Sequence, residues 1–445
     1  MADTEGDKCY VLLDIAYYLI IVNVIIVLML FGIEFDFGGA IKALDLTEHA
    51  MRFVGTWPPK NFQPIFLFFL IYLIVHCTLA IIEIAVNITN MGYVISCLME
   101  NVFNVVALLK ISICKIKRKS LAKFIDDIRS DFTLTNYYYD EEKMAFINYN
   151  KFSRKFVIVL LIASFVASSM YYFLSLAMNI EIVLTNSSYG YRLPYKVWLL
   201  KEPTNIITYV CLCFYQFLII PSIVFGYVGT DCLFVSLVLH VSGLFSALSY
   251  KVKYVLNDTC NREKRLKQLI IRHVRLIRLS ELLEEDFNLV ILLQLIGSIL
   301  QFCIVGYDAL VRSADGNTTM LLSFLFIGSA VACVLLVYCY IGECLIKESS
   351  VLSDALYLCE WYNISKEEKK LMHICMLRST KEMRLTSGKF FVLSLTTFTD
   401  QLFGVGLYRD TEAIIIFLNI IHNKIDKLCL ENVDGLFFSP TNICA

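Results

Sequence analysis

Recurrent apolar blocks of about twenty residues constrain this chain more than any other feature, because a helix of that length crosses the hydrocarbon core of a bilayer. The chain of 445 residues is 58% hydrophobic and only 18% charged, whereas soluble domains carry charge on about a quarter of their residues. The sequence therefore predicts an all-α polytopic membrane protein. Its seven spanning blocks are residues 65–85, 91–113, 156–178, 205–227, 287–307, 320–342 and 390–408.

Two segments outside these blocks are predicted to be helical. The apolar segment 231–250 is interrupted by Asp231 and His240, and we interpret it as a cytoplasmic extension of the fourth helix. The segment 262–286 is predicted to continue the fifth helix below the membrane, either in a cytoplasmic helical bundle or as a basic amphipathic helix on the inner leaflet. Its apolar residues at helical spacing are Leu266, Ile270, Val274, Ile277 and Leu282.

Basic residues alternate between the connecting segments and give an orientation. Segment 114–155 carries ten Lys or Arg residues, 250–286 carries nine and 343–389 carries eight, while the intervening segments hold at most three each. Because basic loops stay in the cytoplasm, the seven-helix core is predicted to begin inside the cell and to end outside. This orientation is inverted relative to a G-protein-coupled receptor.

Glycosylation sequons agree with this orientation. An Asn-x-Ser/Thr triplet occurs in each of the three loops predicted to be external, at Asn87, Asn186 and Asn317. These three asparagines are therefore the candidate glycosylation sites.

Catalytic signatures are missing from the sequence. The chain contains no HExxH, GxSxG, GxxxxGK[ST] or GxGxxG motif. Only Pro221 of its seven prolines falls inside a span, so the broken helices typical of transporter sites are scarce. We expect no enzyme activity, no cofactor, no metal and no nucleic-acid partner.

Glu100, Asn101 and Asn104 lie close together within the second block. A carboxylate in mid-membrane costs several kcal/mol, so Glu100 should face protein or water. The group is interpreted either as part of a ligand pocket or ion path, or as a polar clamp between helices. The sequence leaves both interpretations open.

Aromatic and small polar residues gather near the outer ends of the second, third and fourth blocks. Aromatic belts at the membrane interface explain most such residues, but a small apolar ligand would use the same lining, with one or two hydroxyls to orient it. The candidate ligand-binding residues are Tyr93, Ser168, Tyr171, Tyr172, Tyr209 and Phe214.

A series of short motifs extends over residues 34–398. Upstream motifs are FVGTWPP (53–59), LPYKVW (193–198) and RHVRLIRLSELLEEDFN (272–288). Residues 338–398 contain a Gly-Glu at the base of the sixth block, a Trp-Tyr pair, Leu-Arg-Ser, and Leu-Thr-Ser-Gly-Lys-Phe-Phe leading into the last block. In order, spacing and orientation these motifs resemble the insect odorant receptor family.

The resemblance implies a seven-helix subunit of a tetrameric, ligand-gated, non-selective cation channel in the plasma membrane of a sensory neuron dendrite. Its partners would be a small volatile ligand and the odorant receptor co-receptor. The family's odorant pocket lies between helices two, three, four and six, its cytoplasmic anchor joins subunits, and its last helix lines the pore. The corresponding pore and gate positions are Phe398, Asp400, Gln401 and Leu402.

Both ends of the chain depart from the family pattern. Residues 1–33 add an apolar run that members usually lack, and this run is a spanning helix, a re-entrant or surface helix, or the product of an incorrect gene model. The family pattern is lost around Asp400, so 390–408 is an atypical last helix and 409–445 an atypical tail. An alternative exon or a retained intron would explain this end.

The middle of the chain fits the family pattern. Residues 34–342 hold helices one to six, and residues 343–389 form the anchor and the entry to the last helix. Three rival interpretations remain open: a gustatory receptor of the same superfamily, a metabotropic receptor, and a non-conducting variant.

Overall fold

The computed structural model describes residues 41–59, 63–132, 137, 139–185, 193–199, 203, 205–255, 262–313 and 318–398. Within these ranges the chain is almost entirely helical, which confirms the all-α prediction. The elements are α2 (Ile41–Phe53), α3 (Gln63–Val86), α4 (Met91–Ile116), α5 (Arg118–Arg129), η2 (Ser130–Phe132), α6 (Asp140–Thr185), α7 (Ile206–Phe217), α8 (Ile219–Pro221), η4 (Ser222–Tyr227), α9 (Val228–Val255), α10 (Arg262–Ser313), α11 (Thr318–Leu358), η5 (Trp361–Asn363), α12 (Lys366–Ser379), β1 (Thr386–Ser387) and β2 (Phe391–Val392).

Five helical stretches of the described chain are long and apolar enough to cross a membrane, and they cover the first five predicted blocks to within one residue at an end. They are Gln63–Val86, Met91–Ile116, Asp140–Ala177, Ile206–Tyr254 and Arg262–Tyr307. The sixth block, 320–342, lies within the continuous helix α11. Residues 1–33, 399–408 and 409–445 lie outside the described residues.

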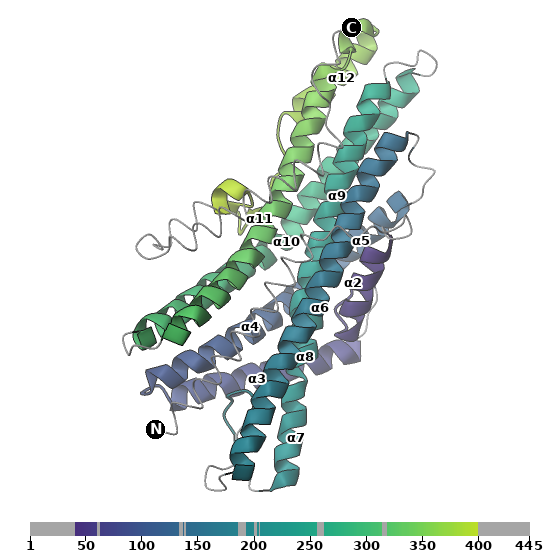
Figure 1. Cartoon of the computed structure of the whole chain (residues 1–445). Helices are drawn as coiled ribbons and strands as arrows, with labels where there is room; N and C mark the ends of the chain where they lie inside the picture. The colour runs from purple at the N-terminus through teal and green to yellow at the C-terminus, as the bar shows by residue number, and fades with distance from the viewer. Residues whose placement is uncertain are drawn as a thin grey trace. The chain divides into compact units, whose positions relative to one another are not determined.

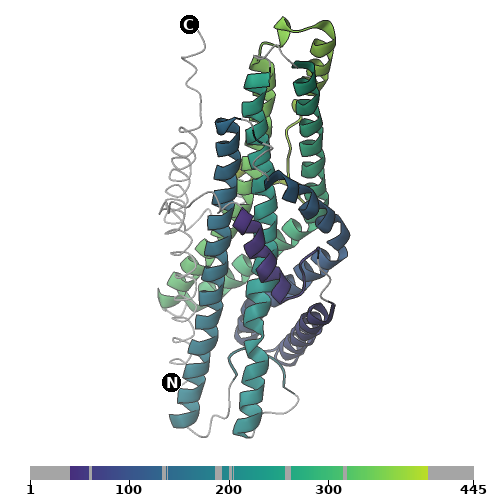
Figure 2. The ribbon, with the colours of Figure 1, turned by 90° about the vertical axis from the view of Figure 1, so that its right-hand side faces the viewer.

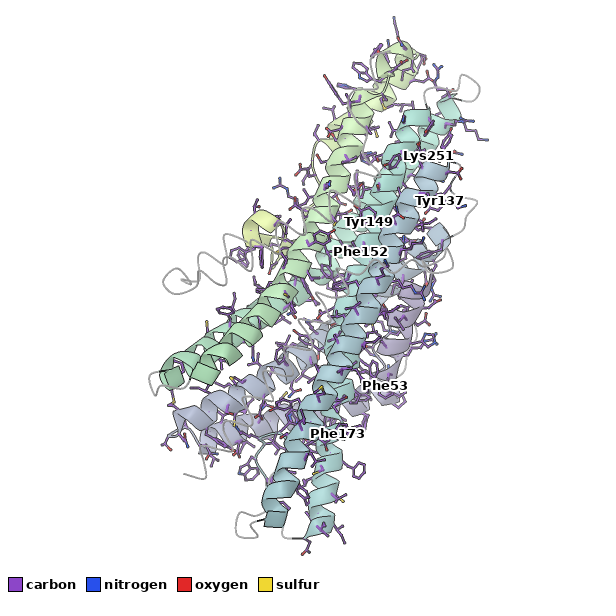
Figure 3. The ribbon with its side chains drawn as sticks, viewed as in Figure 1. Phe53, Tyr137, Tyr149, Phe152, Phe173 and Lys251 are labelled. Carbon is purple, nitrogen blue, oxygen red and sulfur yellow. The ribbon has the colours of Figure 1, made fainter. Side chains whose placement is uncertain are left out.

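The core of the first compact unit, Met1–Ser394, is built on α9. Helices α6 and α9 run side by side (Figures 1 and 2), and α9 also packs against α10 and α11. Figure 3 shows Tyr149 and Phe152 of α6 near α11. The Tyr149 hydroxyl donates to Glu348 Oε1 at 2.7 Å, and the rings of Phe152 and Tyr340 lie 6.0 Å apart. Phe173, nearer the other end of α6, is 54% exposed, as expected of a surface that meets lipid.

Both predicted helix extensions are confirmed. The fourth spanning helix continues through α9 to Val255, and α10 runs unbroken from Arg262 to Ser313. The lower part of α10 packs against α5, α9, α11 and α12, so it belongs to a helical bundle.

The buried face of lower α10 agrees with the predicted stripe only in part, since Leu266 and Ile277 are buried as predicted. Val274, predicted to lie on the apolar stripe, is 58% exposed. The predicted stripe drifts around the helix because its residues are spaced by three, four and five. The observed stripe keeps the alternating three-and-four spacing of a packed helix. Its members are Leu266, Leu269, His273, Leu276, Ser280, Leu283 and Phe287.

A π turn interrupts the fourth spanning helix. Pro221 lacks a backbone N–H, so it cannot make the usual bond to the preceding turn. The six residues of η4, Ser222–Tyr227, follow it directly as a π-helix, and α9 begins at Val228. Single π turns inside α-helices are rare and are frequently found at functional sites.

A two-stranded hairpin connects α12 to the last helix. Thr386 pairs with Val392, and Ser387 pairs with Phe391. The loop between the paired positions has three residues, 388–390, and the Phe390 N–H donates to the Ser387 carbonyl at 3.0 Å. Gly388 and Lys389, at the centre of this turn, both have positive φ, of 58° and 66°, as the central residues of a tight hairpin turn require. The predicted last helix was placed from residue 390, whereas residues 391 and 392 form β2 and the next helical residues are 395–398. The second compact unit begins at Leu395.

Candidate functional site

The segment 193–199 between α6 and α7 folds back against the helices. The backbone N–H of Tyr195 donates to Gln216 Oε1 at 3.0 Å, and Gln216 Nε2 donates to the Tyr195 carbonyl at 2.8 Å. The Ser175 hydroxyl donates to the Pro194 carbonyl at 3.2 Å. These bonds hold the loop to α6 at Ser175 and to α7 at Gln216, and Tyr195 lies inside the bundle, where it is 5% exposed.

Four tyrosines meet beneath this loop and are here called the aromatic cluster: Tyr72, Tyr171, Tyr172 and Tyr195. The ring of Tyr195 lies 5.3 Å from that of Tyr171 and 6.4 Å from that of Tyr172. The Tyr172 hydroxyl donates to the Cys213 carbonyl at 2.7 Å. Tyr72, Tyr172 and Tyr195 belong to one buried hydrophobic cluster, on which Tyr171 packs.

Ser168 lies one turn before Tyr172 on α6 and is 2% exposed. Its hydroxyl has no hydrogen-bond partner within the described residues. An unsatisfied buried hydroxyl costs about 1–3 kcal/mol, so a polar group of a ligand that reached it would be favoured.

Glu100 connects α4 to the closing loop. Its Oε2 accepts the Lys196 backbone N–H at 2.9 Å, and its Oε1 lies 3.7 Å from the Lys196 ammonium. The ammonium also donates to the Ser96 hydroxyl and lies 5.4 Å from the centre of the Tyr93 ring. The Tyr93 hydroxyl donates to Glu83 Oε1 at 2.6 Å. Glu100 thus holds the loop to the helix.

The predicted ligand-binding residues separate into three positions. Ser168, Tyr171 and Tyr172 lie at or near the aromatic cluster, while Tyr93 lies in the polar group around Lys196. Tyr209 is buried in α7, and Phe214 on the same helix is 71% exposed. The sequence did not single out Tyr195 or Gln216 as site residues, because a loop motif carries no sign that it will be buried.

A second site, around Lys110, was not expected from the sequence at all. The Lys110 ammonium is fully buried and donates to Asp231 Oδ1 at 2.5 Å and to Gln294 Oε1 at 2.6 Å. It also lies 3.8 Å from the centre of the Tyr227 ring. The Tyr338 hydroxyl donates to the same Asp231 oxygen at 2.5 Å. We call these five residues the Lys110 cluster.

The Lys110 cluster joins five elements of the core. Its members come from α4, η4, α9, α10 and α11. Gln294 also accepts the Tyr227 hydroxyl at 2.8 Å and donates to Ser298 Oγ at 3.2 Å. Asp231 therefore belongs to a buried ion pair, although the sequence suggested only an interruption of an apolar segment. The lone lysine inside the second apolar block was the available signal.

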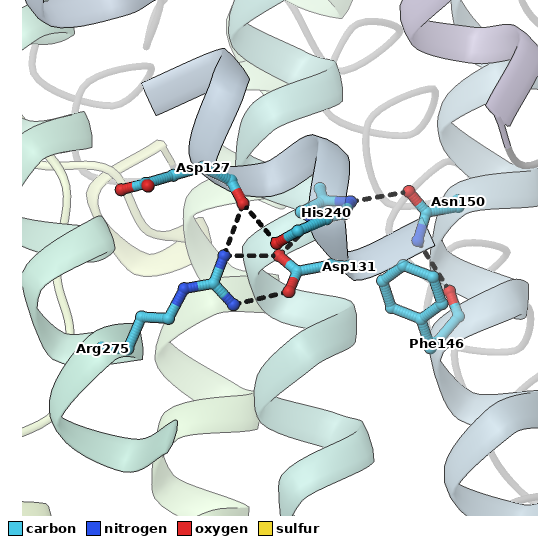
Figure 4. A network of polar contacts seen from close by, with 7 residues as sticks. Asp127, Asp131, Phe146, Asn150, His240 and Arg275 are labelled. Atoms are coloured by element: carbon cyan, nitrogen blue, oxygen red, sulfur yellow. Dashed lines mark hydrogen bonds and ion pairs between the residues drawn. The ribbon is translucent and has the colours of Figure 1, made fainter. Parts of the chain in front are cut away.

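A third polar network lies in the helix extensions (Figure 4). The guanidinium of Arg275 in α10 donates two hydrogen bonds to the Asp131 carboxylate in η2, of 2.5 and 3.0 Å. It also donates to the Asp127 carbonyl at 2.7 Å. His240 of α9 lies 3.4 Å from Asp131 Oδ2 and 3.1 Å from Asn150 Oδ1. Burial raises the pKa of Asp131, but the hydrogen bonds and charges of His240 and Arg275 outweigh it, so the pKa lies below its usual value.

The remaining predicted sites are only partly covered by the structure. Asn87 follows α3, with its side-chain amide donating to Glu83, and is only partly buried. Asn186, Asn317, Asp400, Gln401 and Leu402 lie outside the described residues. Phe398 is the last described residue. In the described ranges, no group of three or more His, Cys, Asp or Glu side chains is placed to hold a metal ion.

Comparison with known proteins decides the family. A family model described as "7tm Odorant receptor" matches residues 90–403, which is well over half of the chain. The chain belongs to the insect odorant receptor family. It is therefore a multi-pass membrane protein of a receptor family rather than of an enzyme family, and the gustatory alternative is not favoured.

Individual odorant receptors match over part of their length. Odorant receptor 82a of Drosophila melanogaster is 28% identical over 213 residues, which cover 47% of this chain and 53% of that one. The odorant receptor coreceptor of Aedes aegypti is 32% identical over 143 residues, which cover 32% of this chain and 30% of that one. The matches thus span about half, or less, of these odorant receptors.

The fold agrees with that of a solved odorant receptor. The insect olfactory receptor OR5 from Machilis hrabei aligns with a TM-score of 0.64 over 87% of this chain and 100% of that one, at 13% identity. The structure of OR5 in complex with eugenol aligns equally well, at 12% identity. The similarity at this identity supports the odorant receptor fold.

Proposed function

We propose that this chain is the ligand-binding subunit of an odorant-gated, non-selective cation channel, which it forms together with the odorant receptor co-receptor. Family membership supports the receptor function, and the matched co-receptor sequences support the partner class. We place the protein in the plasma membrane of a sensory neuron dendrite, with the N-terminal end of its seven-helix core inside the cell. The cytoplasmic extensions of α9 and α10 with α12 form the anchor between subunits.

The aromatic cluster is the proposed odorant site, and its burial is the observation that carries the proposal. The eugenol complex of OR5 shows that a structure of this fold holds a small aromatic molecule. Here, buried tyrosine rings and the unsatisfied Ser168 hydroxyl offer apolar walls and one orienting group, which is the composition of a small-molecule site. The loop residue Tyr195 and its partner Gln216 join the predicted residues in this site.

Gating would follow from a shift of population. An odorant that binds the open conformation more tightly than the closed one moves the equilibrium toward open. The last helix, with Phe398, Asp400, Gln401 and Leu402, is the proposed pore lining.

The test is co-expression with the co-receptor and recording of odorant-evoked current across a panel of small volatiles. A parallel chain carries a family-like sequence from residue 399 onward as a matched control. We expect current from both chains. Current from the control chain alone would identify the natural chain as a non-conducting variant, and current from neither would refute the channel proposal.

The odorant site has its own test in the same cells. Ser168→Ala should shift the half-maximal concentration for ligands with a hydrogen-bonding group, but not for hydrocarbons of the same shape. Ser164→Ala serves as the matched control, because this serine lies one turn earlier on the same helix and its hydroxyl already donates to the Leu161 carbonyl at 3.0 Å. Equal shifts for both ligand classes would contradict the role of Ser168.

A further inference from the structure

The Lys110 cluster lies on a continuous path between the aromatic cluster and the entry to the last helix. On one side, η4 ends at Tyr227, and the same helix carries Gln216 about three turns earlier. Gln216 is the residue that holds Tyr195 in the aromatic cluster. A movement of Tyr195 on ligand binding would therefore act directly on the helix that contains the π turn.

The π turn is an element that can take two packings. A π turn holds about one residue more than an α turn, so its conversion to α-helix would rotate the helix on one side by about 100° relative to the other. The contacts of Tyr227 with Lys110 and Gln294 exist in one register only. The Lys110 cluster therefore biases the register of this helix.

On the other side, the cluster reaches the segment before the last helix through α11. Tyr338, which donates to Asp231, lies one turn before Gly342. A Cβ added at Gly342 would overlap the Leu393 carbonyl oxygen and lie 2.6 Å from Leu393 Cβ. The α11 backbone is therefore in direct contact with the strand end that leads into the last helix. A rotation or shift of α11 at this point must displace Leu393.

We propose that Lys110 and Asp231 are positioning residues that couple ligand binding at the aromatic cluster to the entry of the last helix. This inference rests on the proposed function. The link runs through Tyr227 and the π turn on the ligand side, and through Tyr338 and Gly342 on the pore side. When both charges are removed, the contacts that fix the register of the π turn are lost. The aromatic cluster is then no longer coupled to the segment that leads into the last helix.

If Lys110 and Asp231 only packed the helices together, their charges would have no explanation. Ionised groups at membrane depth are expensive, and replacing a buried ion pair by neutral side chains is often neutral or stabilising. A scaffold that only had to hold five helices together would be served by apolar residues. The double variant Lys110→Met/Asp231→Asn separates the two roles, because it leaves no buried charge unpaired and yet abolishes the pair.

The first experiment records odorant dose–response curves with the co-receptor, at matched surface expression. We expect the double variant to reach the surface like wild type, and to change either the half-maximal odorant concentration or the ligand-independent current by about 2- to 30-fold. Lys115→Met is the matched control: it removes a lysine from the same helix that lies over the Phe66 ring rather than in the cluster. It should stay within about twofold of wild type.

Gly342→Ala tests whether the two sides are coupled. Combined with the double variant, it should give a non-additive change in the same readout, while its combination with Lys115→Met should be additive. Additivity of Gly342→Ala with both backgrounds would overturn the proposed link through α11.

A second readout does not depend on conduction. The Leu393 N–H donates to the Leu385 carbonyl at 2.8 Å, so its hydrogen exchange reports whether the entry segment is held in place. The double variant should raise this exchange rate by about 2- to 30-fold in the purified full-length chain, and Lys115→Met should not. A wild-type chain without odorant-evoked current would refute the proposed function. The hydrogen-exchange rate of the Leu393 N–H would still test whether the Lys110 cluster is coupled to the entry segment. A double variant that matches Lys115→Met in every available readout refutes the inference.

Discussion

The ion pair between Arg275 and Asp131 predicts an unequal effect of removing its two members. Arg275→Met leaves the Asp131 carboxylate, whose side chain is 9% exposed, without its guanidinium partner, and His240 remains 3.4 Å from Oδ2. Asp131→Asn leaves a guanidinium that is 35% exposed and keeps its bond to the Asp127 carbonyl. The stranded carboxylate cannot reach water, whereas the stranded guanidinium can. The arginine variant should therefore be the less stable one.

The structure also sets the size of the two effects. Breaking a buried pair by removing one partner costs about 3–5 kcal/mol, and partial exposure of Arg275 places its removal at the lower end, about 3 kcal/mol. Asp131→Asn keeps an acceptor oxygen and a solvated partner, so it should cost about 1 kcal/mol. Lys267→Met is the matched control on the same helix. Its pair with Glu263, at 2.6 Å, is more than half exposed on both sides, so the loss should be below about 0.5 kcal/mol.

The pH dependence of these variants follows from the pKa of Asp131. In the folded wild type this pKa lies below its ordinary value of 3.8. Its contribution to stability is therefore complete above that ordinary value and is lost only as the pH falls through the folded value. Titration of Asp131 itself should therefore add no pH dependence to the difference between wild type and Asp131→Asn from about pH 5 to pH 8. Without Arg275 the buried carboxylate gains by taking up a proton, so the deficit of Arg275→Met should shrink as the pH falls from 8 to 5.

The assay is the melting midpoint of the purified full-length chain in detergent, measured for wild type and the three variants across this pH range. The expected order is the largest drop in melting midpoint for Arg275→Met, a smaller drop for Asp131→Asn and almost none for Lys267→Met. An Asp131→Asn variant that melts below Arg275→Met would refute it. A deficit of Arg275→Met that grows on acidification would refute it as well.

Three further predictions use the same chain. Asn87→Gln should abolish part of any gel shift produced by an endoglycosidase, and an unchanged shift would show that this sequon is not used. Tyr172→Phe removes the bond to the Cys213 carbonyl and should cost about 1 kcal/mol, seen as a lower melting midpoint. Gly243→Ala places a Cβ 2.9 Å from Tyr149 Cβ, so α6 and α9 must separate, at a cost of about 1–3 kcal/mol; a midpoint equal to wild type would contradict this close approach.

Long, uniformly apolar segments were predictable from the sequence alone. The first five blocks coincide with the five candidate spans to within one residue at an end, because a bilayer demands about twenty apolar residues whatever the neighbouring helices are. The continuation of the fourth and fifth helices was predictable for a related reason. Helical spacing persists through residues 231–250 and 262–286, and neither segment contains a proline or a run of turn residues.

The faces of these helices were not predictable in the same way. In segment 262–286 apolar residues occur on several sides, so more than one stripe fits the sequence. Packing against α9, α11 and α12 selected the stripe through Leu269 and Leu276 and left Val274 exposed. The start of the last helix was missed for a similar reason, because Phe391 and Val392 are apolar in any conformation. The positive φ at Gly388 and the bond from the Thr386 N–H to Glu284 fix them in a hairpin.

The sequence by itself determined that this protein is a helical membrane protein of the odorant receptor family, since hydropathy and motif order are written along the chain. Only the tertiary structure decided which polar residues matter together. Lys110 and Asp231 are 121 positions apart, and a lone lysine or aspartate in an apolar segment looks like a defect until its partner is known. The fold brings them within hydrogen-bonding distance, and in a medium of low polarity this contact turns two costly charges into one neutral, oriented pair.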